Sequence, residues 1–135
     1  MLLSDSKAIS QFIKNGIAGQ DIVLKSKGDQ LYSYSYVADA VSGILYCLVK
    51  GEQGEAYNIA DDASDVTLAE LAKTIAEQTG GKVIFELPDA VEQAGFSKAT
   101  KALLDSRKLQ SLGWRAKFVI KKGLEHTIRI LQDVA

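Results

Sequence analysis

The stretch that decides the fold of this chain runs Gly28-Asp29-Gln30-Leu31-Tyr32-Ser33-Tyr34-Ser35-Tyr36-Val37-Ala38-Asp39. Its middle alternates aromatic and small residues, which predicts an extended segment with three tyrosine rings on one face. Ile22 to Leu24, just before it, is a short apolar run, and the turn residues up to Asp29 close it as a strand. The tyrosine face is therefore expected to meet either the core or a ligand.

Helix-like and strand-like patterns alternate on both sides of this stretch. Before it, Ser4-Asp5-Ser6 offers N-cap chemistry for a helix that ends at Asn15-Gly16. After it, the patterns predict a helix on the stripe Val41, Ile44, Leu45 and Leu48, and then a buried strand over Ala56 to Ala60. The capping box Thr67-Leu68-Ala69-Glu70 opens the next helix, which is followed by a strand over Lys82 to Leu87 and a polar loop over Asp89 to Lys101. A short helix is predicted over Ser106 to Leu112, and a last helix on Ile120, Leu124, Thr127, Ile128 and Leu131. One α/β domain over residues 1–135 is the economical prediction.

Length and charge narrow the range of functions. The chain has 135 residues, enough for one core but too few for a dinucleotide-binding domain and a second domain together. Hydrophobic residues make up 47% and charged residues 24%, and the net charge is -1. This balance predicts no long-range attraction to nucleic acid or to an anionic membrane.

Cysteine usage and the start of the chain bear on its compartment. Cys47 is the single cysteine, so no internal disulfide can form, and its helical context predicts a buried thiol. The first residues show neither a basic region nor a long apolar run. We therefore expect the protein to be cytoplasmic.

The residues of catalytic chemistry are sparse. No glycine fingerprint of the G-x-G-x-x-G kind follows a strand, so no cradle for a dinucleotide pyrophosphate is predicted. His126 is the single histidine and falls opposite the apolar stripe of the last helix, where a solvated side chain is expected. Asp61-Asp62 precedes a helix and suits turn or capping roles. No catalytic residue and no metal ligand is therefore predicted.

Four motifs, in their order along the chain, resemble one known family. They are Gln30 to Asp39, Tyr57-Asn58-Ile59, Thr67 to Ala72, and Asp105 to Trp114 with its Leu-Gly-Trp ending. Together they are similar to the C-terminal part of NAD-dependent epimerases and dehydratases, the extended short-chain dehydrogenases/reductases. The resemblance implies a small mixed α/β substrate-binding lobe, with the Rossmann domain absent from this chain.

The resemblance also implies a ligand and a cofactor. The motifs look like those of the UDP-glucuronate decarboxylases and dTDP-glucose dehydratases, so the ligand would be a nucleotide sugar. NAD and the catalytic Ser/Thr, Tyr and Lys would belong to the N-terminal Rossmann domain of the parent enzyme, which would be this chain's partner. The sugar, the nucleotide and the type of reaction would depend on that missing part.

Substrate-binding residues follow from the same resemblance. Val23 and Leu24 would run along the base and ribose, and Tyr34 and Tyr36 would form the wall of the pocket. Tyr32 would face the pyrophosphate, at a position where the family commonly has arginine, which binds phosphate bidentately. A second basic position of the family would be represented by Lys101.

Other motif residues suit structural roles better. Tyr46 and Lys50 have the Tyr-x-x-x-Lys spacing of the family's catalytic pair, but they follow the tyrosine stretch, whereas the family's pair precedes it. Asp39 suits the start of a helix, Asn58 the backbone groups of a loop, and Trp114 an anchor between the last two helices.

Two classes of function therefore stay open. The first is the substrate-binding lobe of a larger enzyme, inactive by itself, and the second is a free-standing module for ligand or protein interaction derived from that lobe. A lobe that closes on a partner leaves apolar surface uncovered, so self-association is expected. The predicted surfaces are the face around Tyr34 and Tyr36 and the first helix at Phe12 and Ile13.

Overall fold

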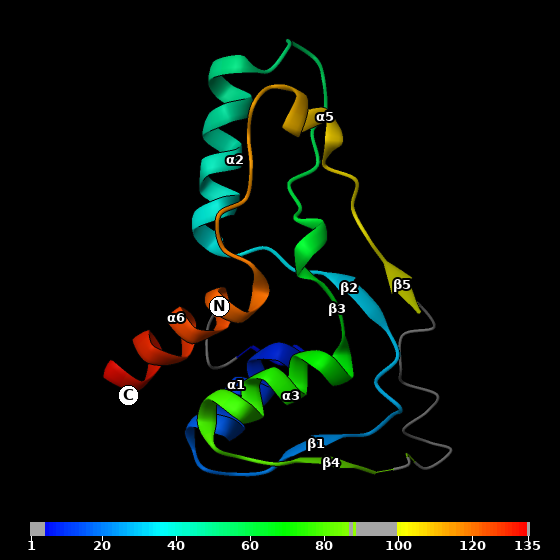
Figure 1. Cartoon of the computed structure of the whole chain (residues 1–135), viewed down its shortest axis with the longest axis vertical. Helices are drawn as coiled ribbons and strands as arrows, with labels where there is room; N and C mark the ends of the chain where they lie inside the picture. The colour runs from blue at the N-terminus through cyan, green and yellow to red at the C-terminus, as the bar shows by residue number, and fades with distance from the viewer. Residues whose placement is uncertain (1–4, 87, 89–99, 135) are drawn as a thin grey trace.

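The computed structural model describes residues 5–86, 88 and 100–134 (Figure 1). In chain order it contains α1 (Ala8–Ile17), β1 (Ile22–Leu24), β2 (Leu31–Ser33), α2 (Val37–Lys50), the 3-10 turn η1 (Asp62–Ser64), β3 (Asp65–Thr67), α3 (Leu68–Thr79), β4 (Val83–Phe85), β5 (Lys101–Ala102), α5 (Arg107–Ser111) and α6 (Ile120–Asp133). This is the small mixed α/β fold that the sequence predicts. No helix in the part that the structure describes is long and apolar enough to cross a membrane.

The strands form two small sheets. Strands β1 and β4 pair in parallel, with Ile22 opposite Val83. In the second sheet β2 is central, antiparallel to β3 and parallel to β5, in the order β3-β2-β5. The predicted strand at Ile22 to Leu24 is confirmed, and of the predicted strand over Lys82 to Leu87 the structure has Val83–Phe85, with residue 87 outside the described part. Residues 89–99 of the predicted loop over Asp89 to Lys101 also lie outside the described part, and Lys101 belongs to β5.

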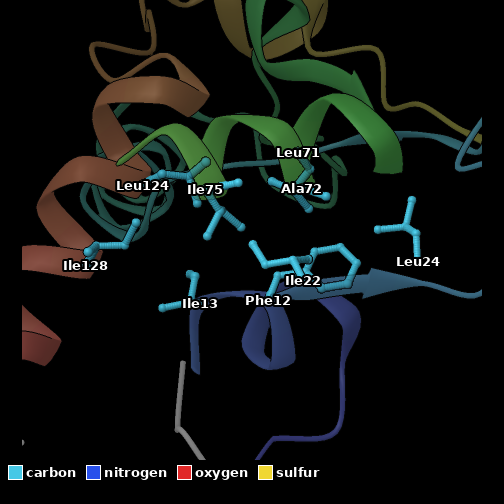
Figure 2. Close-up of a cluster of buried hydrophobic side chains, with 10 residues drawn as sticks. Phe12, Ile13, Ile22, Leu24, Leu71, Ala72, Ile75, Leu124 and Ile128 are labelled. Atoms are coloured by element: carbon cyan, nitrogen blue, oxygen red, sulfur yellow. The ribbon is translucent and has the colours of Figure 1, made fainter. Parts of the chain in front are cut away.

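The hydrophobic core joins α1, β1, α3 and α6 (Figure 2). Its buried members come from segments far apart in the sequence: Phe12, Ile13, Ile22, Leu24, Leu71, Ala72, Ile75, Ala76, Leu124 and Ile128. Ile13 is 0% exposed and Phe12 is 6% exposed. The prediction that these two residues form an exposed surface for self-association is therefore wrong, because α3 and α6 cover the apolar face of α1.

Helix α3 begins where its sequence predicts. The Thr67 hydroxyl accepts a hydrogen bond from the Glu70 N–H, and the Glu70 carboxylate accepts one from the Thr67 N–H, which confirms the capping box. Gly80, in the left-handed conformation at φ 74°, ends the helix. In contrast, α1 starts after Lys7 with no side-chain cap, so the N-cap predicted within Ser4 to Ser6 is wrong.

The segment from Ala56 to Ala60 forms no strand, contrary to the sequence prediction. None of the N–H groups of residues 56–60 donates a hydrogen bond to another described residue. A sequence pattern can indicate which residues suit a strand, but it does not show which neighbouring strand they would pair with. Within the described ranges no strand lies against this segment.

Candidate functional site

Tyr32 and Tyr34 lie on the central strand of the second sheet and just beyond its end. Their ring centroids are 6.5 Å apart in an edge-to-face arrangement, as expected for residues two apart on one face of an extended segment. Burial, and then the neighbouring Tyr32, raise the pKa of the Tyr34 hydroxyl. Tyr34 packs against the core, whereas Tyr32 is half-buried on the three-stranded sheet.

Tyr36 does not continue this row. It is the residue before α2, and its ring packs on Phe118 at 4.9 Å and on His126 at 5.9 Å between centroids. The prediction of three tyrosine rings on one face is therefore right for Tyr32 and Tyr34 and wrong for Tyr36, because the chain turns into α2 there. The sequence did not single out Phe118, and it did not predict that His126 would meet Tyr36, since only the fold brings these rings together.

His126 is half-buried in this aromatic cluster, so the prediction of a solvated histidine is wrong. Its ring lies 5.5 Å from that of Phe118, centroid to centroid. The helical periodicity placed His126 away from the main core correctly, but a second, smaller cluster covers that side of α6. Among the described residues, no group of three or more His, Cys, Asp or Glu side chains could hold a metal ion.

Lys101 lies on β5, next to the strand of Tyr32. The parallel register pairs Lys101 with Leu31 and Ala102 with Tyr32. Directly paired residues point to the same face of a sheet and consecutive residues to opposite faces. Lys101 and Tyr32 therefore lie on neighbouring strands but on opposite faces, and the structure does not bring their side chains together.

Val23 and Leu24 lie on β1, in the other sheet. Leu24 is 1% exposed and belongs to the core, so its side chain is closed to a ligand in this structure. Val23, one residue earlier, is half-buried on the opposite side of the strand. Of this predicted pair, Val23 alone has a side chain that a ligand could reach.

An apolar groove of about 340 Å³ runs between α1, α6 and the start of α2. Tyr34 and Tyr36 lie on its wall, with Ile9, Leu124 and Leu131 opposite them. Its polar groups are hydroxyls such as those of Ser35 and Thr127, and none of the described residues that line it is charged. The groove can therefore hold an apolar or aromatic group, but it offers no cation for a phosphate.

Most cations near the second sheet already have partners. Arg107 donates to both oxygens of Asp105, and this hydrogen bonding lowers the pKa of the Asp105 carboxyl to about 2. Lys108 pairs with Glu55 and lies over the Tyr57 ring. Lys101 makes no ion pair with a described residue, and it is exposed. It is therefore the cation of β5 that remains available to an anion.

Three motif residues fill structural roles. Asn58 donates its side-chain N–H to the Asp105 carbonyl, which satisfies a loop backbone group as predicted. Asp39 is buried and accepts the N–H groups of Lys117 and Phe118, so its role is structural, but it ties down a loop and does not cap its own helix. Trp114 is buried and donates to Ser42 of α2, a partner that the sequence did not predict.

The remaining candidates lie on exposed or half-buried surface. The Lys50 ammonium lies 5.1 Å from the centre of the Tyr46 ring, above the ring and near the exposed end of α2. Cys47, predicted as a buried thiol, is half-buried on the same helix. Asp61 accepts from Ala63 N–H and Ser64 Oγ, as a capping residue of η1 does.

Comparison with known proteins identifies the class to which this fold and these motifs correspond. Residues 3–60 match the model of the NAD dependent epimerase/dehydratase family. The chain is 31% identical over 125 residues to mouse dTDP-D-glucose 4,6-dehydratase, covering 90% of this chain and 35% of that protein. It is 28% identical over 124 residues to UDP-glucuronic acid decarboxylase 6 of Arabidopsis thaliana, covering 92% of this chain and 35% of that protein.

Solved structures agree on the fold. The Bordetella bronchiseptica enzyme WbmF in complex with NAD+ and UDP superposes with a TM-score of 0.77 at 26% identity, over 94% of this chain and 37% of WbmF. UDP-glucose 4-epimerase of Thermotoga maritima gives a TM-score of 0.79 at 24% identity, over 95% of this chain and 40% of the epimerase.

The resemblance predicted from the four motifs is thus confirmed. The chain is related to the NAD-dependent epimerases and dehydratases, with UDP-glucuronic acid decarboxylases and dTDP-glucose dehydratases among its relatives. It spans about a third of the length of these curated relatives, 35% in each of the two cases above.

Proposed function

We propose that this chain is the nucleotide-sugar-binding lobe of an NAD-dependent sugar-nucleotide epimerase or dehydratase and is not catalytic alone. NAD and the catalytic groups would be supplied by an N-terminal Rossmann domain of the parent protein. The observation that carries the proposal is the match along nearly the whole chain to the Bordetella enzyme whose structure contains NAD+ and UDP. A free-standing module derived from this lobe is the alternative.

Within this proposal the second sheet carries the phosphate contacts. Tyr32 is on its central strand, and Lys101 on the neighbouring strand has no described ion-pair partner. Because the two residues lie on opposite faces, one pyrophosphate at one face would contact one of them. The groove beside Tyr34 and Tyr36, which is apolar and aromatic, suits a base or a sugar ring better than a phosphate.

The experiment measures binding of UDP and dTDP by calorimetry to the chain and to two variants at Tyr32. Tyr32→Arg adds a planar, charged donor, and a charge-assisted hydrogen bond is worth about 1.5–3 kcal/mol, or roughly tenfold or more in affinity. The gain should shrink as salt rises, because a partly exposed ion pair is screened. Tyr32→Lys is the matched control and should gain less, since it lacks the planar fork.

Unchanged or weaker binding in both variants would show that Tyr32 does not face the phosphates. Lys101→Ala tests the other face of the sheet: a loss of affinity there, with no gain at Tyr32, would move the phosphate site to Lys101. Titration with NAD should show no binding to this chain. A micromolar NAD site, or turnover of a sugar nucleotide that Tyr46→Phe abolishes, would contradict the proposed division of labour.

A further inference from the structure

Strand β5 has few backbone contacts of its own. It consists of two residues, Lys101 and Ala102, and both are exposed, so it buries no side chain in the core. It lies at the free edge of the second sheet, where β2 is the one described strand that pairs with it (Figure 1). Just before β5, the Leu31 N–H donates to the Thr100 carbonyl at 3.0 Å. A strand this short and exposed needs further contacts to keep one register.

The Ser33 side chain supplies such a contact. Its hydroxyl donates to Asp65 Oδ1 on β3 at 2.5 Å. The same hydroxyl oxygen accepts the backbone N–H of Leu104, two residues after β5, at 3.1 Å. One side chain of the central strand therefore ties both of its neighbours to it.

This position requires a group that donates and accepts at the same time. A carboxylate accepts and cannot donate, whereas a backbone N–H donates and cannot accept. The Asp65 carboxylate takes the hydroxyl hydrogen of Ser33, which leaves the oxygen lone pairs for the Leu104 N–H. Asp65 thereby orients the hydroxyl, through a hydrogen bond that its charge makes stronger than one between neutral groups.

Ser33 and Lys101 lie on the same face of the sheet. Lys101 pairs with Leu31, and Ser33 is two residues beyond Leu31 on β2, so both side chains leave the sheet on one side. Asp65 pairs with Ser33 and shares this face, but it lies on β3, two strand spacings or about 10 Å from β5. Asp65 therefore holds the Ser33 hydroxyl without pairing with Lys101.

We infer that Ser33 is a positioning residue of the proposed nucleotide site. Its hydroxyl clamps β5 to the central strand, and β5 borders both faces of the sheet on which a phosphate contact is proposed. Lys101 lies on one face, and Ala102 lies beside Tyr32 on the other. This inference rests on the proposed function. A strand that is already fixed loses less conformational freedom when an anion binds beside it, so more of the interaction energy appears as affinity.

Hydrogen exchange tests the clamp on the chain itself, without a ligand. In Ser33→Ala the Leu104 amide loses its acceptor and should exchange about fivefold or more faster than in wild type. Ser33→Thr keeps a hydroxyl on a strand, where a β-branched residue is well accommodated, and should exchange like wild type. Ser111→Ala is the matched control, because its hydroxyl donates to the Lys108 carbonyl at α5, and it should leave exchange at Leu104 unchanged. Equal exchange at Leu104 in all four proteins would overturn the inference.

Two ligands separate a positioning role from a merely structural one. UDP carries the diphosphate, and uridine has the same base and ribose without it. In NMR titrations Ser33→Ala should bind UDP about fivefold more weakly than wild type, the equivalent of one hydrogen bond, and should bind uridine as wild type does. Ser33→Thr should restore the affinity for UDP. An equal loss for both ligands in Ser33→Ala would mean a general loss of structure, and it would overturn the inference.

Failure of the proposed function gives a different result from failure of this inference. If UDP binds and Ser33→Ala leaves its affinity unchanged, the nucleotide site stands and the positioning role of Ser33 is wrong. If the wild-type chain binds neither UDP nor dTDP, the nucleotide site is wrong and the role of Ser33 toward it falls too. The exchange of the Leu104 amide then still decides whether Ser33 holds β5.

Discussion

The carboxylate of Asp39 accepts a hydrogen bond from the backbone N–H of Phe118 at 2.9 Å, and its other oxygen accepts that of Lys117 at the same distance. Asp39 is 3% exposed. One buried side chain near the start of α2 thus fixes the segment that leads into α6. The Phe118 ring, placed in this way, packs against Tyr36 and His126.

Asp39→Ala should destabilise the fold by about 2–3 kcal/mol, because two buried N–H groups lose a charged acceptor. Urea denaturation at neutral pH measures the change. Asp133→Ala, at an exposed position at the end of α6, is the control and should change stability by less than about 0.5 kcal/mol. Equal stability of the two variants would mean that the segment at Lys117 does not depend on Asp39.

Trp114 and Ser42 should behave as a coupled pair. The indole N–H donates to Ser42 Oγ at 2.9 Å. Trp114→Phe keeps a buried ring but removes the donor, and a loss of about 1 kcal/mol is expected. Ser42→Ala also removes the hydrogen bond that the Ser42 hydroxyl donates to the Asp39 carbonyl, so it should cost somewhat more. The double variant should cost less than the sum of the two. Additive losses would show that the hydrogen bond contributes nothing measurable.

The turn at Gly28, between β1 and β2, is closely packed, and substitution there tests this packing. Gly28 has φ 71°, and a Cβ there would lie 2.5 Å from the Leu24 side chain and 2.8 Å from Ala69 Cβ. Gly54 has a similar φ of 82° with nothing within 4 Å. Gly54→Ala should therefore cost the backbone strain alone, about 1–2 kcal/mol, and Gly28→Ala about 1–3 kcal/mol more from overpacking. Similar melting temperatures for the two variants would contradict this.

The capping box at Thr67 predicts a pH dependence. Hydrogen bonds from the Thr67 backbone and side chain lower the pKa of the Glu70 carboxyl below its ordinary value of 4.5. A folded-state pKa below the unfolded one means that the stabilisation is present above the unfolded pKa and is lost as pH falls through the folded one. Thr67→Ala should cost about 1 kcal/mol at pH 7.

The difference in the free energy of unfolding between Thr67→Ala and wild type should shrink as pH falls below about 4, because Glu70 is then protonated. Thr74→Ala is the control, because its hydroxyl donates to the Glu70 carbonyl and not to the carboxylate. If the difference in the free energy of unfolding between wild type and Thr67→Ala stays constant from pH 7 to pH values below about 4, the carboxylate takes no part in the cap.

The sequence by itself determined the elements that depend on local chemistry. The capping box sets the start of α3, Gly80 its end, and the apolar run at Ile22 to Leu24 a strand. The four motifs and their order predicted the family, which the comparisons confirm. These features could be predicted because each depends on residues a few positions apart, whose preferences act before the chain folds.

Only the tertiary structure decided which residues those elements contact. Periodicity predicted a helix at Val41 to Leu48, but it could not say that the core side would be Asp39 and Gly43, because a stripe shows that a face is apolar and not what covers it. The register of β5 put Lys101 and Tyr32 on opposite faces, and the fold carried Tyr36 to Phe118 and His126. Each of these outcomes joins residues far apart in the sequence, so it is set by packing and strand register and not by local preference.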